Sequence, residues 1–418
     1  MELSTLALLL AQIAAILLLS RAIALVTNGL GQPLVMAEMI AGILLGPSLL
    51  GQVAPHAFRV LFLVASLGIL KTLSQLGLVL FMFVIGLELD PKLLRERRGA
   101  SVLISNVGIL VPFGLGLAAA FGLHARYAPS GVAFLPFALF LGTAMSVTAF
   151  PVLARILQSN GLMHSRVGTI AIACAAVDDV TAWCLLAFVV AIARAHGLSE
   201  VALTLALTVA FVLTMFFVAR PLLRRLGQRV AARGSLVSAE LVLVLLLLLA
   251  SAGITELIGI HALFGAFLFG AVLPKEVAKP LIEKLEVVAV FLLLPLFFAY
   301  SGLNTRIGLV SGAQDWLVVL GIIALATLGK FGGSSLAARA TGLNWREASA
   351  IGVLMNTRGL MELIVLNVGM ELGVISPTMF TMLVIMALTT TFATTPILRW
   401  INPEPQVVRT GEALLTRT

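Results

Sequence analysis

Between residues 168 and 192 the chain reads Gly168-Thr-Ile-Ala-Ile-Ala-Cys-Ala-Ala-Val-Asp-Asp-Val-Thr-Ala-Trp-Cys-Leu-Leu-Ala-Phe-Val-Val-Ala-Ile192. This run is long enough to cross a bilayer as a helix, which takes about 20 apolar residues. Its only charged side chains are the adjacent Asp178 and Asp179. Carboxyl groups at mid-membrane depth are costly unless they are paired or hydrated. We therefore expect the two aspartates to belong to a path for cations or protons.

The composition of the whole chain is that of a polytopic membrane protein. Hydrophobic residues make up 60% of the 418 residues and charged residues 11%, and the mean hydropathy is +1.12. A soluble domain needs a polar surface that this composition cannot supply. We expect an all-α fold.

Apolar runs between charges and Gly or Pro breaks predict thirteen spans. They are residues 5–27, 33–49, 70–89, 99–121, 133–157, 166–195, 199–219, 237–255, 259–275, 285–301, 312–338, 347–370 and 377–400. An odd number puts the termini on opposite sides. With the N-terminus outside, 20 basic residues fall on the inner side and 5 on the outer side. The positive-inside rule therefore predicts an outer N-terminus and an inner C-terminus, in the cell inner (plasma) membrane.

The net charge of +8 follows from this topology, and we do not read it as a footprint of nucleic-acid binding. The basic run from Arg220 to Arg233 is most simply a face attracted to anionic lipid of the inner leaflet.

Two basic residues, Lys330 and Arg358, fall inside predicted spans. A buried Lys stays charged only if a carboxylate holds it. Neighbouring side chains on a helix point about 100° apart, so one of Asp178 and Asp179 can pair with Lys330 while the other faces a cation path. The alternative is a Lys that snorkels from a helix end, but Lys330 lies well inside its span.

Two spans carry signs of a broken helix. In the fifth span, Pro151 removes a backbone hydrogen bond just after Ser146 and Thr148; the alternative is an ordinary kink. The twelfth span contains Met355-Asn356-Thr357-Arg358-Gly359-Leu-Met-Glu362 in an otherwise apolar run. Glu362 lies four residues after Arg358, a spacing that favours an internal ion pair. Unwound backbone at membrane depth supplies oxygen atoms for cations.

The two interrupted spans are seven positions apart, and an odd offset indicates a repeat that is inverted in the membrane. A weak echo between Ala41-Gly-Ile-Leu-Leu-Gly-Pro47 and Phe269-Gly-Ala-Val-Leu-Pro274 has the same offset. This architecture is typical of secondary transporters.

At these residues the chain resembles the monovalent cation:proton antiporter superfamily, in the branch with Kef-type transporters, bacterial sodium/proton antiporters and plant cation/proton exchangers. The matching stretches are Gly31-Gln-Pro-Leu-Val-Met-Ala-Glu-Met-Ile-Ala-Gly-Ile-Leu-Leu-Gly-Pro47, Gly86-Leu-Glu-Leu-Asp90, Ser146-Val-Thr-Ala-Phe-Pro-Val-Leu-Ala-Arg155, Asp178-Asp179, Gly259-Ile-His-Ala-Leu-Phe-Gly265, Lys330 and Met355-Asn-Thr-Arg-Gly-Leu-Met-Glu362.

The resemblance implies a homodimer of thirteen-helix chains in the sodium/proton antiporter fold, with broken helices five and twelve crossing beside the acidic pair. The single transporter domain, residues 1–400, would comprise a dimerisation part (about 1–69 and 199–301) and a mobile core part (about 70–195 and 312–400), followed by a short cytoplasmic tail, 401–418. By the same resemblance, Asp179 would carry the ion and the proton, and Asp178 would pair with Lys330, as in electrogenic members.

These observations together predict a secondary antiporter that exchanges Na+ or Li+ for protons, because a buried carboxyl group can hold a proton or a dehydrated cation but not both. Asp179 and Thr148, with Ser146, are the expected ligands of the transported Na+. K+/H+ exchange is the alternative within the class. A cation channel would need a filter-like segment, which is not visible. The patterns His-Glu-x-x-His and Gly-x-Ser-x-Gly are missing from the sequence, so we expect neither an enzyme nor a cofactor.

Overall fold

The computed structural model describes residues 4–29, 32–62, 64–88, 98–163, 165–194 and 198–401, and the residues it describes form helices and connecting turns without strands. The expected tail beyond Ile401 lies outside the described residues, as do Gly31, Leu89 and Asp90 of the family stretches.

The first half of the chain runs through α1 (Thr5–Gly29), α2 (Leu34–Leu45), α3 (Leu50–Val53), α4 (Pro55–Leu61), α5 (Val64–Glu88), α7 (Arg98–Tyr127), α8 (Phe134–Ser146), α9 (Phe150–Ser159), α10 (Arg166–Arg194) and α11 (Leu198–Thr214). The second half continues with η1 (Met215–Ala219), α12 (Arg220–Arg233), α13 (Ser238–Ile258), α14 (Ala262–Val272), α15 (Lys275–Glu286), η2 (Val287–Leu293), α16 (Leu294–Asn304), η3 (Ile307–Leu309), α17 (Gly312–Thr327), η4 (Leu328–Gly332), α18 (Gly333–Ala340), α19 (Trp345–Met355), α20 (Leu360–Glu371) and α21 (Pro377–Ile401).

Each of the thirteen predicted spans coincides with a helix, a helix continued through a π-helical turn, or a broken pair of helices. In the described part of the chain, nine helical segments are both long and apolar enough to cross a membrane. The other spans are shorter or interrupted, such as α8 and α14. The short helices α3 and α4, between spans two and three, were not predicted.

The packing of the helices repeats with the offset of seven spans. The pair α1 and α2 has its counterpart in α13 and α14, and α2 packed on α16 has its counterpart in α14 packed on α5. In the same way α7 with α8 corresponds to α18 with α19, and α7 with α10 corresponds to α17 with α21. Because pairs with the same offset pack together in both halves, the contacts support the inverted repeat.

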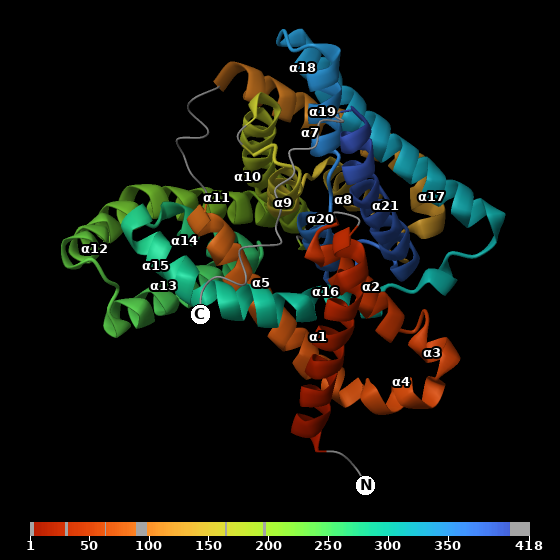
Figure 1. Ribbon diagram of the computed structural model, residues 1–418, viewed down its shortest axis with the longest axis horizontal. Coiled ribbons are helices and arrows are strands. Elements are labelled where there is room, and N and C mark those ends of the chain that lie inside the picture. Colours follow the sequence, from red (N-terminus) through yellow and green to blue (C-terminus); the bar gives the residue numbers. More distant parts are fainter. Residues whose placement is uncertain are drawn as a thin grey trace.

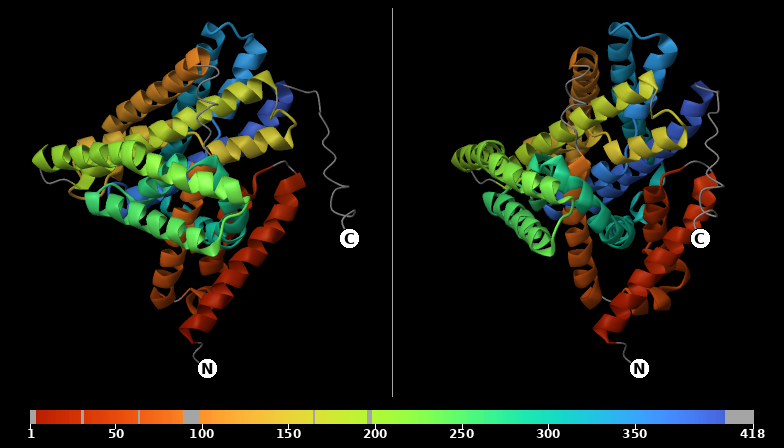
Figure 2. Two further views of the ribbon diagram at one scale, coloured as in Figure 1. Left: turned by 90° about the vertical axis from the view of Figure 1, so that its left-hand side faces the viewer. Right: turned by 60° about the vertical axis from the view of Figure 1, so that its left-hand side comes forward.

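The helices fall into two groups by contact (Figure 1). We call residues 5–88 and 198–304 the scaffold part, and residues 98–194 and 312–401 the core part. In Figure 1 the core part fills the upper half, and the scaffold part lies below and to the left. The two further views in Figure 2 show α1 as a long helix along one flank of the scaffold part.

One expected boundary differs from the structure. The third span, α5, was assigned to the core part, but its main contacts are with α14, α15 and α16 of the scaffold part. The cause is a close approach of two glycines: a Cβ at Gly86 would collide with the Phe267 carbonyl, and one at Gly270 with the Phe83 carbonyl. Small residues allow membrane helices to pack this closely. The apolar run located this span correctly, but it does not indicate which helices pack against α5.

Candidate functional site

The site is built where the two broken helices of the core part meet. The chain leaves the helical conformation between Ser146 and Phe150, and again between Met355 and Leu360. The two extended segments touch, since the Ala149 N–H donates to the Thr357 carbonyl at 3.1 Å. Helix ends and unpaired peptide groups therefore converge inside the protein, which is tolerated at membrane depth only when protein or a cavity surrounds them.

Local sequence explains both breaks. Pro151 stands in the first turn of α9, where its missing N–H would have no helical partner in any case. Gly359 has φ 130° and ψ −114° immediately before α20, a conformation that is essentially restricted to glycine. The predicted breaks at Pro151 and Gly359 thus correspond to the starts of two half-helices.

Arg358 ties the two broken helices together. Its guanidinium donates to the carbonyls of Ala144 (2.9 Å) and Met145 (2.6 Å), at the C-terminal end of α8. Such terminal carbonyls have no partner within their own helix. The same guanidinium forms the expected ion pair with Glu362, with Nη1 and Oε2 3.0 Å apart and both side chains fully buried. The pair balances a charge that would otherwise be isolated in the core.

Asp178 is surrounded by hydrogen-bond donors. Ser105 Oγ donates to its Oδ1, and Thr148 Oγ1 (2.7 Å) and Lys330 Nζ (2.8 Å) donate to its Oδ2. Lys330 also donates to the Ser146 carbonyl. The side chains of Asp178 and Lys330 are fully buried. Three donors, one of them cationic, therefore hold this carboxyl group in place.

Lys330 lies in the π-helical turn η4. Just before it, Gly329 packs closely on α7, since a Cβ there would come within 2.9 Å of the Pro112 Cα. Single π-helical turns inside helices occur frequently at functional sites. The turn was not predicted from the sequence.

Asp179 has the opposite environment. It is buried, and neither carboxyl oxygen has a well-aligned hydrogen-bond donor among the residues described. The Phe150 N–H at the start of α9 interacts with this carboxyl group only as a weak backbone hydrogen bond. Asp179 shares a face of α10 with Trp183, four residues later. The Trp183 ring stacks on the Phe267 ring of the scaffold part, with the ring centroids 6.2 Å apart. A buried carboxyl without partners is stable only when neutral or bound to a cation or water. Asp179 is therefore the group free to take a ligand.

Of the expected cation ligands, Thr148 contacts Asp178, and the Met355 carbonyl, 3.0 Å from Thr148 Oγ1, is the alternative acceptor for its single hydroxyl proton. The Ser146 hydroxyl donates to the Thr143 carbonyl at 2.9 Å. In the other break, Asn356 and Thr357 are buried. The Thr357 hydroxyl lies 3.5 Å from the Thr394 hydroxyl of α21, and no hydrogen bond joins any of these side chains to Asp179 among the residues described.

Sequence reasoning missed Ser105. It belongs to α7, far from the motifs in sequence, and is completely buried. Its position four residues after Ser101, in a largely apolar span, is the signal that was available.

Crossed broken helices beside a buried acidic pair, within an inverted repeat, define a secondary transporter. A family model described as "Sodium/hydrogen exchanger, transmembrane" matches residues 14–401. The chain belongs to this family.

Several relatives are similar over almost the whole chain. Identity is 43% to the Na+/H+ antiporter NhaS4 of Synechocystis sp., over 97% of this chain and 100% of that protein. Identity is 42% to cation/H+ antiporter 17 of Arabidopsis thaliana, over 93% of this chain and 48% of that protein. It is 36% to K+/H+ antiporter 1 of Saccharomyces cerevisiae, over 96% of this chain and 47% of that protein. The chain thus spans about half the length of the plant and yeast relatives.

Among solved structures, the sodium proton antiporter MjNhaP1 of Methanocaldococcus jannaschii superposes with a TM-score of 0.64. The alignment covers 95% of this chain and 97% of that one, at 16% identity. This likeness supports the fold described above.

Proposed function

We propose that this protein exchanges Na+ or Li+ for protons by alternating access of one buried site. The observation that carries the proposal is the contrast within the acidic pair: three side chains can donate to Asp178, whereas neither buried oxygen of Asp179 has a side-chain donor among the described residues. A site that binds one ligand at a time requires such an available carboxyl.

Competition at Asp179 couples the two fluxes. A proton or a dehydrated cation can neutralise the carboxylate, but not both together. Thr148 Oγ1 and the carbonyls exposed by the breaks would complete the coordination of Na+ after a small movement, since oxygen ligands suit this ion. The core part would carry the occupied site past the scaffold part, and the return step would require the other ligand.

The pair between Lys330 and Asp178 supports electrogenic exchange. If the Asp178 carboxylate turns toward a bound cation, Lys330 loses its counter-ion and can release its own proton. Two protons would then move against one Na+, so that the exchange carries current.

The decisive experiment uses Asp179→Asn in proteoliposomes that contain a pH-sensitive dye and are challenged in turn with Na+, Li+, K+ and choline. The change preserves side-chain volume but removes the titrating group and its charge, so exchange should be abolished. Asp315→Asn, the same chemical change in a carboxylate held by Tyr127 and Arg126 away from the site, should still exchange. Normal Na+-driven dissipation of the proton gradient by Asp179→Asn would refute its role as the carrier.

K+/H+ exchange is the second candidate, and it is favoured by the yeast relative named a K+/H+ antiporter. The Bacillus cereus relative, 29% identical, is named a Na+/H+-K+ antiporter. The same assay separates the candidates, because K+ would then replace Na+ as the ion that dissipates the gradient.

The remaining parts of the proposal concern the assembly. We infer a homodimer through the scaffold part, in the inner membrane of the cell, with the N-terminus outside and anionic lipid bound by the basic helix α12. The charge bias between the predicted loops supports this orientation.

A further inference from the structure

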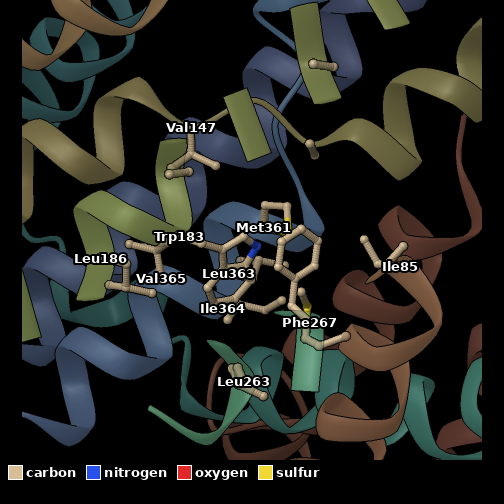
Figure 3. Packing of buried hydrophobic residues seen from close by; sticks show 14 of the residues in the cluster. Ile85, Val147, Trp183, Leu186, Leu263, Phe267, Met361, Leu363, Ile364 and Val365 are labelled. Atoms are coloured by element: carbon tan, nitrogen blue, oxygen red, sulfur yellow. The ribbon is translucent and has the colours of Figure 1, made fainter. Parts of the chain in front are cut away.

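The seam between the two parts is apolar near the site. Figure 3 shows Phe267 and Leu263 of the scaffold part lying against Trp183, Met361 and Ile364 of the core part. These side chains are almost completely buried. Along α20, which starts at the crossing and ends at Glu371, the apolar contacts give way to polar ones.

Glu371 reaches from the end of α20 to two helices of the scaffold part. Lys71 Nζ lies 3.0 Å from its Oε1, and Gln75 Nε2 donates to the same oxygen at 2.8 Å. His261 Nε2 lies 3.9 Å from its Oε2. One turn earlier, Asn367 Nδ2 donates to Ser301 Oγ of α16 at 2.7 Å. The cavity lined by this cluster has a volume of only about 20 Å³, which leaves room for roughly one water molecule.

A second ion pair crosses the seam beside the first. Arg194 Nη2, at the end of α10, lies 3.2 Å from Glu256 Oε1 in α13. The other oxygen of Glu256 accepts from the Ala262 N–H at 2.9 Å. The end of α13 therefore receives Arg194 through Glu256, and the turn that follows it approaches Glu371 through His261. Both core-part elements meet the scaffold at one corner.

These contacts must break if the two parts slide past each other. All of them lie at the face where α20 ends and α14 begins, which the distribution of basic residues puts outside. Ion pairs that water can reach are individually weak, so they favour a closed arrangement without locking it.

We propose that Glu371, with its partners Lys71, Gln75 and His261, is an outer latch that forms when Asp179 is closed to the outer face and opens once in every transport cycle. The inference rests on the proposed alternating access. It extends that function by assigning a gating role to residues that contact neither the cation nor the acidic pair.

The first test joins the latch covalently. In a Cys184→Ser background, which removes the exposed native thiol, Lys71→Cys/Glu371→Cys is treated with a short, reducible bismethanethiosulfonate linker. Exchange should fall at least tenfold and return on reduction. Arg126→Cys/Asp315→Cys is the matched control, because that ion pair lies within the core part, and its cross-link should leave exchange unchanged.

Two outcomes are distinguishable. Fully cross-linked Lys71→Cys/Glu371→Cys protein that exchanges at its unlinked rate overturns the latch. Absence of exchange in the wild-type protein overturns the proposed function itself.

The second test opens the latch. Leu263→Cys, placed in the apolar seam below Glu371, should react slowly with a membrane-impermeant thiol reagent applied from outside to right-side-out vesicles. Adding Glu371→Gln should raise the labelling rate several-fold, and so should adding Lys71→Gln. Glu283→Gln is the control, because Glu283 is an exposed carboxylate of α15, and it should leave the labelling rate of Leu263→Cys unchanged. Equal labelling rates in all of these proteins would also overturn the proposal.

Discussion

At the scale of single residues, the protein separates two adjacent carboxylates by giving them different neighbours. Consecutive positions on α10 point in different directions, so Asp178 meets α7 and η4, whereas Asp179 meets the start of α9. The hydrogen bonds that hold Asp178 come from three separate elements of the core part. The chemical difference between the two aspartates is therefore a property of the surrounding packing.

The Lys330 charge should be needed for both stability and current. Lys330→Gln leaves Asp178 buried without its cationic partner, which costs about 3 to 5 kcal/mol for a broken buried pair. The variant should melt at lower temperature, and its residual exchange should lose dependence on membrane potential. Exchange at potentials clamped with K+ and valinomycin tests this if K+ is not a substrate. A wild-type rate insensitive to potential would contradict electrogenic exchange and leave the pair with a structural role.

Ser105 should contribute measurably to stability through Asp178. Ser105→Ala removes a hydrogen bond to a charged group, a loss of about 1.5 to 3 kcal/mol, whereas Ser105→Thr keeps the hydroxyl. Ser20→Ala is a matched control, because the Ser20 hydroxyl is also buried but has no hydrogen-bond partner among the described residues. Thermal unfolding in detergent measures all three. Equal melting temperatures for Ser105→Ala and Ser20→Ala would contradict the assigned contact.

At the scale of helices, the breaks determine what the site can hold. Arg358 occupies the carbonyls that end α8 and the carboxylate that begins α20, so the two broken helices form one unit. The backbone between them can then present carbonyl and hydroxyl oxygens without collapsing. The backbone turns most sharply at Gly359, directly before α20, where φ is 130°.

Gly359→Ala should disrupt this unit. A side chain at φ 130° is strained by about 1 to 3 kcal/mol, and relief of the strain would shift the start of α20. We expect a lower melting temperature and reduced cation affinity in the pH-dye assay. Gly321→Ala, in the middle of α17 with open space around it, should change neither. Full affinity in Gly359→Ala would indicate that the crossing tolerates a different turn.

At the scale of the whole molecule, exposed charge and apolar surface describe how the protein sits in a bilayer. Helix α12 buries Leu223, Leu226 and Val230, while Arg224, Arg225 and others stay exposed. On the proposed inner side, a basic face suits anionic headgroups.

Anionic lipid should therefore support the wild-type protein more than a neutralised variant. Each basic residue near such a surface contributes about 1 kcal/mol, so Arg224→Gln/Arg225→Gln/Arg229→Gln should lose most of the effect. The melting temperature of the protein in vesicles, or its exchange rate, is compared with and without phosphatidylglycerol to measure the effect of the lipid. Arg59→Gln, at an exposed position of α4 on the proposed outer side, should behave like the wild type. An equal lipid response in the triple variant would contradict the assignment of α12.

The membrane class, the thirteen spans, both helix breaks and the family could be read from the sequence, because apolarity, proline, glycine and charge act locally and are visible in a linear pattern. The sequence also restricted the partner of Lys330 to two adjacent aspartates. Four further facts came from the folded structure: Asp178 contacts Lys330, Ser105 joins them, α5 packs on α14, and Glu371 meets Lys71 across the seam. Each of these is a contact between residues far apart in the chain. Such contacts depend on helix rotation and on how closely small residues let backbones approach, neither of which apolar periodicity specifies.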